Sequence, residues 1–357
     1  MSSSALVIAI NEYPAVSRLR PLAGAVSDAV DFADWALHEN GGDVDPGNLY
    51  FWTYPAPGNV PERLAQASGT ERAWPTDIRP DFNRAPDAAA IKRAARAAAE
   101  TAVREEIGRL FIFFAGHGVQ VVVPGYREDP QNCFVAADYI PNESEGLVPL
   151  DDLRRMCVHL GPSQALLFFD CCRNQLLPTA SRPQLLLGDY IAEAAGEKAW
   201  LAATAARSGA LAYETPLHSP NRGAFTKMFV QGLRQFRRDD RLTLDQLKGF
   251  VRSGVGELVK PNQQVPQFYV SDDQHPFELA EGGPIGSLPS LVVTFGSNEG
   301  PDIDIKDDRA VIVASLARSN APQSLPLPVG QYSLECAETQ EHRAINHFGP
   351  EDTHVLF

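Results

Sequence analysis

The sequence lacks any long hydrophobic run, since no apolar stretch approaches the roughly 18 residues that cross a membrane. Its opening residues, MSSSALVIAI, also lack the basic segment that begins a secretory signal peptide. Basic residues are too few to form a stripe for nucleic-acid phosphates, because 31 Lys and Arg stand against 45 Asp and Glu and the net charge is −14. We therefore expect a cytoplasmic protein that binds neither membranes nor nucleic acid directly.

Cysteine is also scarce. The five cysteines stand at positions 133, 157, 171, 172 and 336, and none belongs to a CxxC pair. This scattered, odd set fits neither a disulfide framework nor a zinc site, so we expect reduced thiols and no resident metal or cofactor. The 357 residues, 44% apolar and 21% charged, have the balance of a folded chain with one large domain and a small one.

Two short apolar runs end abruptly at residues capable of chemistry. Arg109–Gly118 reads RLFIFFAGHG, and Gln164–Asn174 reads QALLFFDCCRN. Such runs predict strands that are buried on both faces of a parallel sheet. Ligands and reactions in open α/β sheets lie beyond the carboxyl ends of the strands. We therefore expect His117 and Cys172 to lie side by side at one edge of the sheet.

The remaining sequence alternates strand-like and helix-like patterns, which favours an α/β fold with a mostly parallel sheet flanked by helices. The other predicted strands are Ser4–Ile10, Asn48–Tyr54, Ala199–Ala206 and Pro266–Ser271, with a β-hairpin at Val119–Pro124 and Asn132–Asp138. The first predicted helix has an apolar stripe from Val26 to Leu37 and is ended by Asn40-Gly41-Gly42, and the others are Ala85–Ile107, Pro149–His159, Gly223–Arg234 and Leu242–Lys260. Pro55–Arg84 is predicted as a long loop with room for one helical turn, and Leu176–Lys198 as a loop with a short helix.

Glycines and prolines cluster at residues 282–289, which predicts a linker. We place one domain at residues 1–281 and a small domain at residues 290–357. Short strands expected at Leu291–Phe295, Ala310–Ala314 and Gln331–Glu335 indicate a small all-β domain, similar to a β-sandwich. It carries no catalytic pattern, and we expect it to bind a regulatory partner or ligand, or to cap the chain.

A Cys/His nucleophilic site needs a thiol, a base and N–H donors for the developing oxyanion. His117 can supply the base and Cys172 the nucleophile, with the N–H groups of Gly118 and Cys172 as oxyanion donors. Side chains alternate along an extended segment, so Cys171 points away from Cys172. The alternative is that His117 is a turn residue and Cys172 a buried, inert thiol. No third member of a triad is evident.

The sequence around these residues resembles the caspase and metacaspase superfamily of cysteine peptidases. Gly116-His117-Gly118 follows one apolar strand, and Asp170-x-Cys172 ends another some 55 residues later, close to the interval of roughly 50 residues in caspases. Further matching segments occur in the family order: Ala9-x-Asn11-x-Tyr13, Leu22-x-Gly24-x-x-x-Asp28-Ala29, Ser208-Gly209-Ala210 with Glu214, Gly223-x-Phe225-Thr226, and Gln264-x-Pro266-Gln267. The resemblance implies the caspase-hemoglobinase fold and a protein or peptide substrate.

The resemblance also implies a specificity pocket. The residue two before the nucleophile is Asp170, as in metacaspases, which cleave after Arg or Lys with this aspartate and one that corresponds to Asp28. Two buried carboxylates favour a cation, and a guanidinium fits a carboxylate through two hydrogen bonds. The alternative for Asp28 is a residue that only stabilises a helix N-terminus. Ala25 and Ala115 stand where metacaspases have a cysteine and a serine, and Arg173-Asn174-Gln175 replaces their His-Ser-Gly.

Many metacaspases need calcium. The candidate calcium ligands in this sequence are Asp239-Asp240 and Asp272-Asp273, and neither pair has the spacing of a calcium-binding loop. Solvated surface acids are the simpler interpretation. Glu214 and Asp138 are further carboxylates that could line the cleft, but solvated loop residues are the simpler interpretation for both. Arg182 precedes a proline and Lys198 begins a strand, so no site of self-cleavage is predicted.

The leading hypothesis is a cysteine endopeptidase that cleaves after Arg or Lys, with His117 and Cys172 as the catalytic dyad. Its prokaryotic relatives imply a role in stress, cell death or defence. The alternatives are a catalytically silent caspase-like scaffold that binds a partner, and a peptidase held inactive until a partner or ligand meets the C-terminal domain.

Overall fold

The computed structural model describes most of the chain: residues 1–14, 16, 19–68, 84–122, 130–141, 143–173, 176–178, 198–215, 221–237, 241–271, 277–297, 299–348 and 352–357. The chain divides into two compact units, one of Met1–Lys227 with Val255–His275, the other of Met228–Gly254 with Pro276–Phe357. Each unit is described by itself. None of the described helices is both long and apolar enough to cross a membrane.

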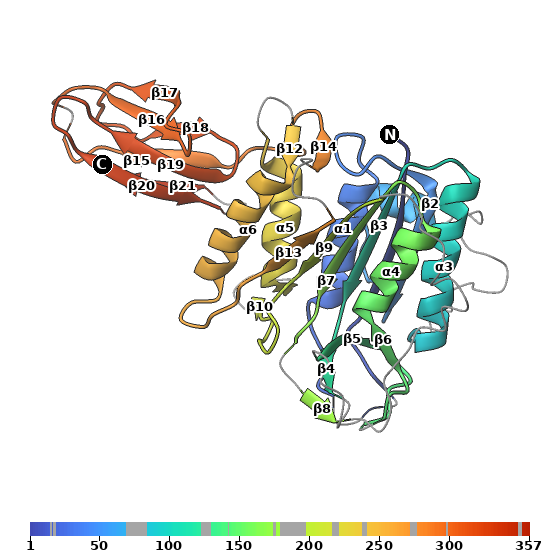
Figure 1. The fold of residues 1–357 in the computed structure, drawn as a ribbon. Helices are drawn as coiled ribbons and strands as arrows, with labels where there is room; N and C mark the ends of the chain where they lie inside the picture. Colours follow the sequence, from blue (N-terminus) through green and yellow to red (C-terminus); the bar gives the residue numbers. More distant parts are fainter. Residues whose placement is uncertain are drawn as a thin grey trace. The chain divides into compact units, whose positions relative to one another are not determined.

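The first unit is built on a six-stranded sheet in the order β13-β9-β7-β3-β1-β2 (Figure 1). The strands are β1 (Ser3–Ile10), β2 (Val44–Tyr54), β3 (Arg109–Ala115), β7 (Gln164–Asp170), β9 (Ala199–Thr204) and β13 (Gln267–Val270). All neighbours are parallel except β13, which is antiparallel to β9. The predicted α/β fold with a mostly parallel sheet is confirmed.

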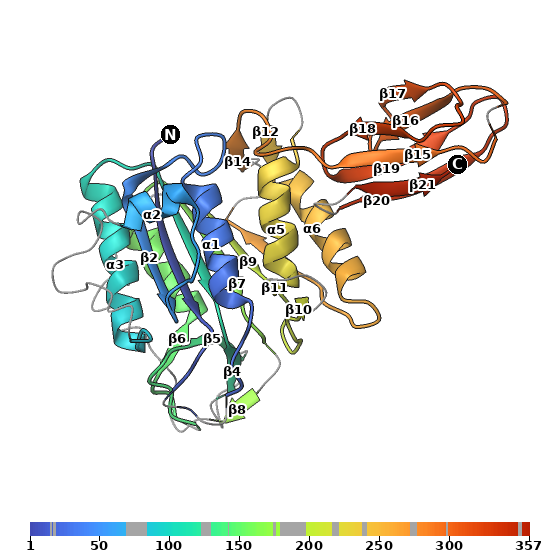
Figure 2. The same cartoon turned by 180° about the vertical axis from the view of Figure 1, so that it is seen from behind.

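Helices cover both faces of this sheet, as the two opposite views show (Figures 1 and 2). Helix α1 (Ala25–Ala36) packs on one face, where Phe32 stacks on Phe113 at 4.6 Å between ring centroids. Helices α3 (Ala88–Arg104) and α4 (Leu150–Leu160) pack on the other face, in one core cluster with Phe114 and Phe169. Because successive side chains of a strand face opposite sides, burial of both faces explains the wholly apolar runs.

The two strands that carry the candidate residues are direct neighbours. β3 and β7 run parallel in register, with Ala115 opposite Asp170, so both end at the same edge. The predicted adjacency of these strands is confirmed. It brings the turn after β3, which holds His117, beside the turn after β7, which holds Cys172.

A second, four-stranded sheet in the order β6-β5-β4-β8 follows β3. The predicted hairpin is present as β4 (Gly118–Val122) and β5 (Gln131–Val135), and the sequence patterns did not indicate β6 (Leu147–Pro149) or β8 (Leu176–Pro178). The predicted long loop contains helix α2 (Glu62–Ser68), with residues 69–83 outside the described part. Most of Leu176–Lys198, in which a short helix is predicted, also lies outside the described residues. The small pair β10 (Glu214–Thr215) and β11 (Arg222–Gly223) completes this unit.

The second unit contains most of α5 (Ala224–Gln235) and α6 (Leu244–Leu258), the pair β12 (Arg241–Thr243) and β14 (Glu278–Glu281), and an all-β module. The module has a three-stranded sheet, β18-β15-β21, and a four-stranded sheet, β17-β16-β19-β20, around their own apolar core. Its strands are β15 (Ser290–Thr294), β16 (Ile303–Asp307), β17 (Ile312–Leu316), β18 (Gln323–Pro326), β19 (Gly330–Glu335), β20 (His342–His347) and β21 (Thr353–Leu356). The predicted C-terminal β structure is confirmed.

The segment 282–289, predicted as a linker, contains no helix or strand. It is nevertheless attached to α5, because Ile285 is buried and its N–H donates to the carbonyl of Arg234 at 2.7 Å. Further along, Phe250 of α6 meets Phe348 edge to face, at 5.2 Å between centroids. These contacts join the β module to α5 and α6 within one compact unit, and the domain limits at residues 281 and 290 stay a prediction.

Candidate active site

His117 is held by its backbone and by its ring. Its N–H donates to the hydroxyl oxygen of Tyr13 at 2.9 Å, and the two rings lie 5.1 Å apart. The imidazole Nε2 lies 2.7 Å from the carbonyl oxygen of Arg20. A carbonyl only accepts, so Nε2 carries the proton and Nδ1 is the basic nitrogen. Burial lowers the pKa of His117, which keeps the ring neutral and able to accept a proton.

The Arg20 carbonyl is the orienting group that sequence patterns did not supply. In a triad, a third group fixes the tautomer of the histidine. Here that group is a backbone oxygen 97 residues before His117 in the sequence. Every residue type carries such an oxygen, so no sequence signal marks it. Tyr13, by contrast, belongs to the motif Asn11-x-Tyr13 and was open to detection.

Cys172 differs from the other cysteines in its exposure. All five lie in described regions, and Cys172 is half-buried whereas the other four are buried. Its Sγ lies 3.4 Å from both the N–H and the carbonyl oxygen of Ala212. Burial raises the pKa of the thiol, so the thiol of Cys172 and the imidazole of His117 are both neutral at rest. Such a thiol becomes nucleophilic only when a base takes its proton.

Gly118 makes room for the cysteine turn. A Cβ at this position would collide with the carbonyl oxygen of Cys172 and would lie 2.9 Å from the Sγ of Cys171. The N–H of Val135 donates to the carbonyl of His117 at 3.0 Å. Opposed residues of an antiparallel ladder alternate between hydrogen-bonded and non-hydrogen-bonded pairs, so the next pair, Gly118 and Phe134, is a non-hydrogen-bonded one. The N–H of Gly118 is therefore not used in pairing with β5. This is the geometry in which it can serve as an oxyanion donor, and its close packing is a second reason for glycine here.

Asp28 and Asp170 are brought together at Gly223. A Cβ on Gly223 would collide with Oδ2 of Asp170 and would lie 2.9 Å from Oδ2 of Asp28. The N–H of Gly223 donates to Oδ2 of Asp28 at 2.9 Å. Thr226, in the first turn of α5, donates its hydroxyl to Oδ2 of Asp170 at 2.6 Å. The two carboxylates therefore share one small space, as the S1 pocket prediction requires.

Both carboxyl groups are buried and electrostatically strained. Asp28 is 2% exposed and Asp170 8%. Burial raises the pKa of Asp170 to about 6. Burial, and after it the charge of Asp170, raise the pKa of Asp28 well above its usual range. Within the described structure, Oδ1 of Asp28 has no hydrogen-bond partner. A cation placed here would relieve both effects.

Glu214 lies in the candidate site, although its sequence context predicted a solvated loop residue. Its interpretation as a solvated loop residue is wrong, because the carboxylate is half-buried and accepts the N–H groups of Ala23 at 2.9 Å and Gly24 at 2.6 Å. The pKa values of Cys172 and Asp170 are raised mainly by burial, and the negative charge of Glu214 adds a smaller increase to both. A carboxylate at the start of α1 is favoured by the backbone N–H groups there.

Asp138 is likewise not a solvated loop residue. Its Oδ1 accepts the N–H of Ala88 at 2.8 Å, at the first residue of α3, and so it helps to cap that helix. Gln264, from another motif noted in the sequence, is buried and links two segments of the site. It accepts the N–H of Tyr213 at 2.9 Å and donates to the carbonyl of Ala205 at 3.0 Å. These bonds fix the loop whose Ala212 contacts Cys172.

No group of three or more His, Cys, Asp or Glu side chains within the described ranges has the arrangement of a metal site. The acidic pairs Asp239-Asp240 and Asp272-Asp273 lie outside the described residues, as do Asn174-Gln175 and Arg182. Lys198 is described, and its ammonium group donates to the carbonyls of His159 and Gly161 at 3.0 and 2.7 Å.

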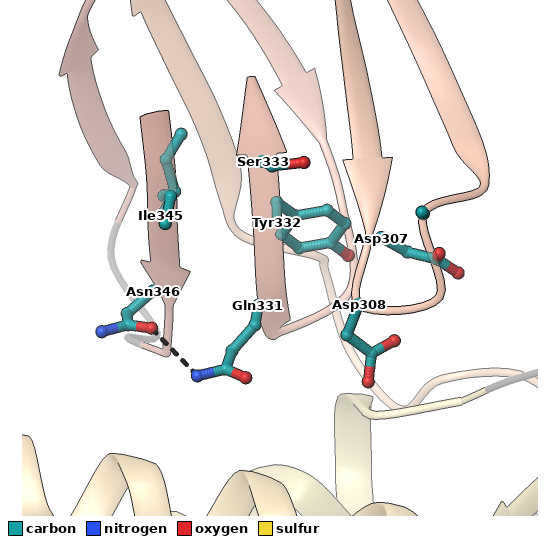
Figure 3. A pocket seen from close by; sticks show the side chains of 9 residues that line it. Asp307, Asp308, Gln331, Tyr332, Ser333, Ile345 and Asn346 are labelled. Atoms are coloured by element: carbon teal, nitrogen blue, oxygen red, sulfur yellow. Dashed lines mark hydrogen bonds between the residues drawn. The ribbon is translucent and has the colours of Figure 1, made fainter. Parts of the chain in front are cut away.

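The β module carries a separate cavity of about 370 Å³ on β19 and β20 (Figure 3). There Gln331 donates to Asn346 at 3.3 Å, and the hydroxyl of Tyr332 donates to the carbonyl of Pro328 at 2.7 Å. Asp307 and Asp308 line the same cavity. The described residues of the lining include neither cysteine nor histidine.

Comparison with known proteins decides the family. The family model described as the caspase domain, peptidase C14, matches residues 2–278, more than three quarters of the chain. The chain belongs to the caspase-domain family of peptidases. The caspase domain thus covers β1 to the start of β14, including every residue of the site described above. No curated protein matches the sequence. Among solved structures, the crystal structure of protein GSU0716 from Geobacter sulfurreducens is similar, with a TM-score of 0.46 and 14% identity over 80% of this chain and 100% of that one.

Proposed function

We propose that this caspase-domain protein is a cysteine endopeptidase that cleaves protein substrates after Arg or Lys. Cys172 is the nucleophile, His117 the general base and acid, and Asp28 with Asp170 form the S1 pocket. The observation that carries the specificity is the convergence of two buried carboxylates at Gly223, one with an oxygen that lacks a hydrogen-bond partner among the described residues. A P1 guanidinium or ammonium supplies the missing positive charge.

The reaction begins with transfer of the Cys172 proton to Nδ1 of His117, whose Nε2 keeps its own proton and donates it in a hydrogen bond to the Arg20 carbonyl. The thiolate attacks the scissile carbonyl carbon, and the N–H groups of Gly118 and Cys172 stabilise the oxyanion. The imidazolium then gives its proton to the leaving amine, and an acyl-enzyme forms. His117 next removes a proton from water, which attacks the thioester, and Cys172 is released with its proton restored.

The proposed specificity of this pocket depends on charge. A P1 Arg reaches carboxylates that are costly to ionise in isolation, so its binding is strongest where both are deprotonated. An acidic P1 residue is disfavoured by the same carboxylates and by Glu214. The pocket requires glycine at position 223, because a side chain there would occupy the space between the carboxylates of Asp28 and Asp170.

Hydrolysis of fluorogenic peptides that differ only in P1, as Arg, Lys or Asp, tests this proposal. Wild type is expected to cleave after Arg and Lys, and Cys172→Ala to be inactive. Cys171→Ala is the matched control, since Cys171 is buried beside Gly118, and it is expected to retain activity. Cleavage after Asp but not Arg contradicts the pocket assignment, and activity in Cys172→Ala contradicts the nucleophile.

We further propose a cytoplasmic location and a role in stress, cell death or defence. We also propose that a regulatory partner binds the β module. These proposals are supported by the composition and by the family resemblance. The cavity on β19 and β20 is the proposed place for that partner.

A further inference from the structure

A cavity of about 1020 Å³ lies in the first unit, on the face of the sheet that also carries α4. Its floor consists of residues that alternate along β9, namely Trp200, Ala202 and Thr204, and therefore face the same side. Tyr269 of β13 extends this floor, since it pairs with Ala202. The size is that of a pocket for a small organic ligand.

The described residues that line the cavity carry a positive charge in an acidic protein. They include three arginines and one aspartate, Arg154, Arg155, Arg173 and Asp151, which together have a formal charge of +2 in a chain of net charge −14. Asp151 bonds both α4 arginines, at 2.7 Å to Arg154 and 2.9 Å to Arg155, and orients them without neutralising both. A cavity of this charge selects an anion, and a basic P1 side chain is not its occupant.

Arg173 is the buried cation of the cavity, at 5% exposure. Its Nε donates to Asn132 at 2.9 Å, and its Nη1 donates to Thr204 and to the carbonyl of Ala206, each at 3.1 Å. The Nη2 group takes part in none of these bonds. The guanidinium is thus held rigidly, with one further donor group for a ligand, as recognition of a phosphate requires.

The floor also offers a place for a flat ring. Trp200 is half-buried, with the Arg154 guanidinium 4.1 Å from its ring centroid, and Tyr269 is 44% exposed. Aromatic side chains of this kind stack with planar heterocycles. Neutral polar groups of Asn132 and Ser208 line the cavity between the charged and aromatic parts.

We propose that this cavity binds a small phosphate ester that carries a planar ring, the chemistry of a mononucleotide. A phosphate monoester has a charge of about −1.5 to −2 at pH 7, which matches the +2 of the lining. The phosphate lies among the arginines and the ring on Trp200 and Tyr269.

Binding has a consequence for catalysis, because Arg173 directly follows Cys172. Its N–H donates to the carbonyl of Ala210 at 3.0 Å, and its carbonyl accepts the N–H of Gly209 at 2.8 Å. A ligand that holds the guanidinium therefore stabilises the turn that carries Cys172. This consequence rests on the proposed function, whereas binding itself does not.

Isothermal titration of the full-length Cys172→Ala protein with AMP, GMP, CMP and UMP, and with inorganic phosphate and adenosine, tests the proposal without any need for peptidase activity. At least one nucleotide is expected to bind about tenfold more tightly than inorganic phosphate or adenosine, because only the nucleotide has both parts. Arg155→Glu and Tyr269→Ala are each expected to weaken that binding about tenfold, since both side chains are accessible and line the cavity.

Arg96→Glu on α3 is the matched control, a comparably exposed arginine that does not line the cavity, and it is expected to leave the affinity unchanged. Thermal unfolding of each variant verifies that it is folded. Absence of saturable binding for all four nucleotides at millimolar concentration overturns the proposal, and so does unchanged affinity in folded Arg155→Glu and Tyr269→Ala.

Discussion

Asp28 and Asp170 direct their Oδ2 atoms at the same glycine, Gly223, although they come from α1 and from the end of β7. The N–H of Gly223 donates to Oδ2 of Asp28, and both the N–H and the hydroxyl of Thr226 donate to Oδ2 of Asp170. Two buried carboxylates this close disfavour each other's ionisation. A bound cation reverses this effect, and this is the basis of the proposed preference for a basic P1 residue.

Asp28→Asn and Asp170→Asn are each expected to lower kcat/KM for a P1 Arg peptide about 100-fold or more, because one partner of a buried charge pair is lost. Steady-state hydrolysis measures this. Asp45→Asn is the control, since Asp45 is exposed and bonds only its own turn at Gly47. An unchanged kcat/KM in both pocket variants contradicts the assignment.

Asp170→Asn is also expected to change the pH dependence of stability. The pKa of Asp170 is raised in the folded state to about 6, so its protonated form contributes stability at pH 4 that is lost as pH rises through 6. Relative to wild type, the variant gains up to about 3 kcal/mol in free energy of unfolding between pH 4 and pH 7.5. Urea unfolding at the two pH values measures it. If the difference in free energy of unfolding between the variant and wild type does not vary with pH, folding does not raise the pKa of Asp170.

The neutral resting state of Cys172 and His117 predicts slow alkylation at low pH. Burial raises the pKa of the thiol and lowers that of the imidazole, so a thiolate–imidazolium pair is disfavoured. The rate of carboxamidomethylation of Cys172 by iodoacetamide, followed by peptide mass spectrometry, is expected to rise continuously from pH 5 to pH 9. A fast rate that is constant below pH 7 indicates an ion pair and contradicts the mechanism.

Tyr13→Phe removes the oxygen that accepts the His117 N–H and keeps the ring beside the imidazole. We expect a loss of about 1–3 kcal/mol in stability and a lower kcat with little change in KM, since His117 is displaced and the S1 pocket is not. Tyr54→Phe is the control, because Tyr54 is a half-buried tyrosine at the end of β2 and the described hydrogen bonds and ring contact of His117 involve Tyr13, Arg20 and Val135 instead. A variant with normal kcat shows that Tyr13 does not position the histidine.

Much of the fold follows from the sequence because the signals are local. The runs RLFIFFA and QALLFFD are apolar on both faces, which only a covered parallel sheet accommodates, and β3 and β7 are indeed neighbours. The Ala-rich pattern likewise predicts α3. Short strands such as β6 and β8 escaped detection, since three residues carry too little periodicity to be recognised.

The site was predictable only where a side chain carries the chemistry. His117, Cys172, Asp28 and Asp170 stand in recognisable patterns. The Arg20 carbonyl has no sequence signature, and the anchoring of Glu214 at Ala23 and Gly24 depends on a contact across 191 residues. The cavity around Arg173 is equally hidden, because its lining comes from β5, α4, β7, β9 and β13.

The central claim, a Cys172 nucleophile beside a pocket for a basic side chain, is tested most directly by covalent labelling. The full-length protein is treated with a peptidyl chloromethyl ketone that carries Arg at P1, or with the same peptide carrying Asp, and the modified residue is mapped by mass spectrometry. The arginyl reagent is expected to label Cys172 alone, much faster than the aspartyl reagent, and Asp170→Asn to remove this preference. Labelling of another residue, or equal rates for the two reagents, would contradict the account.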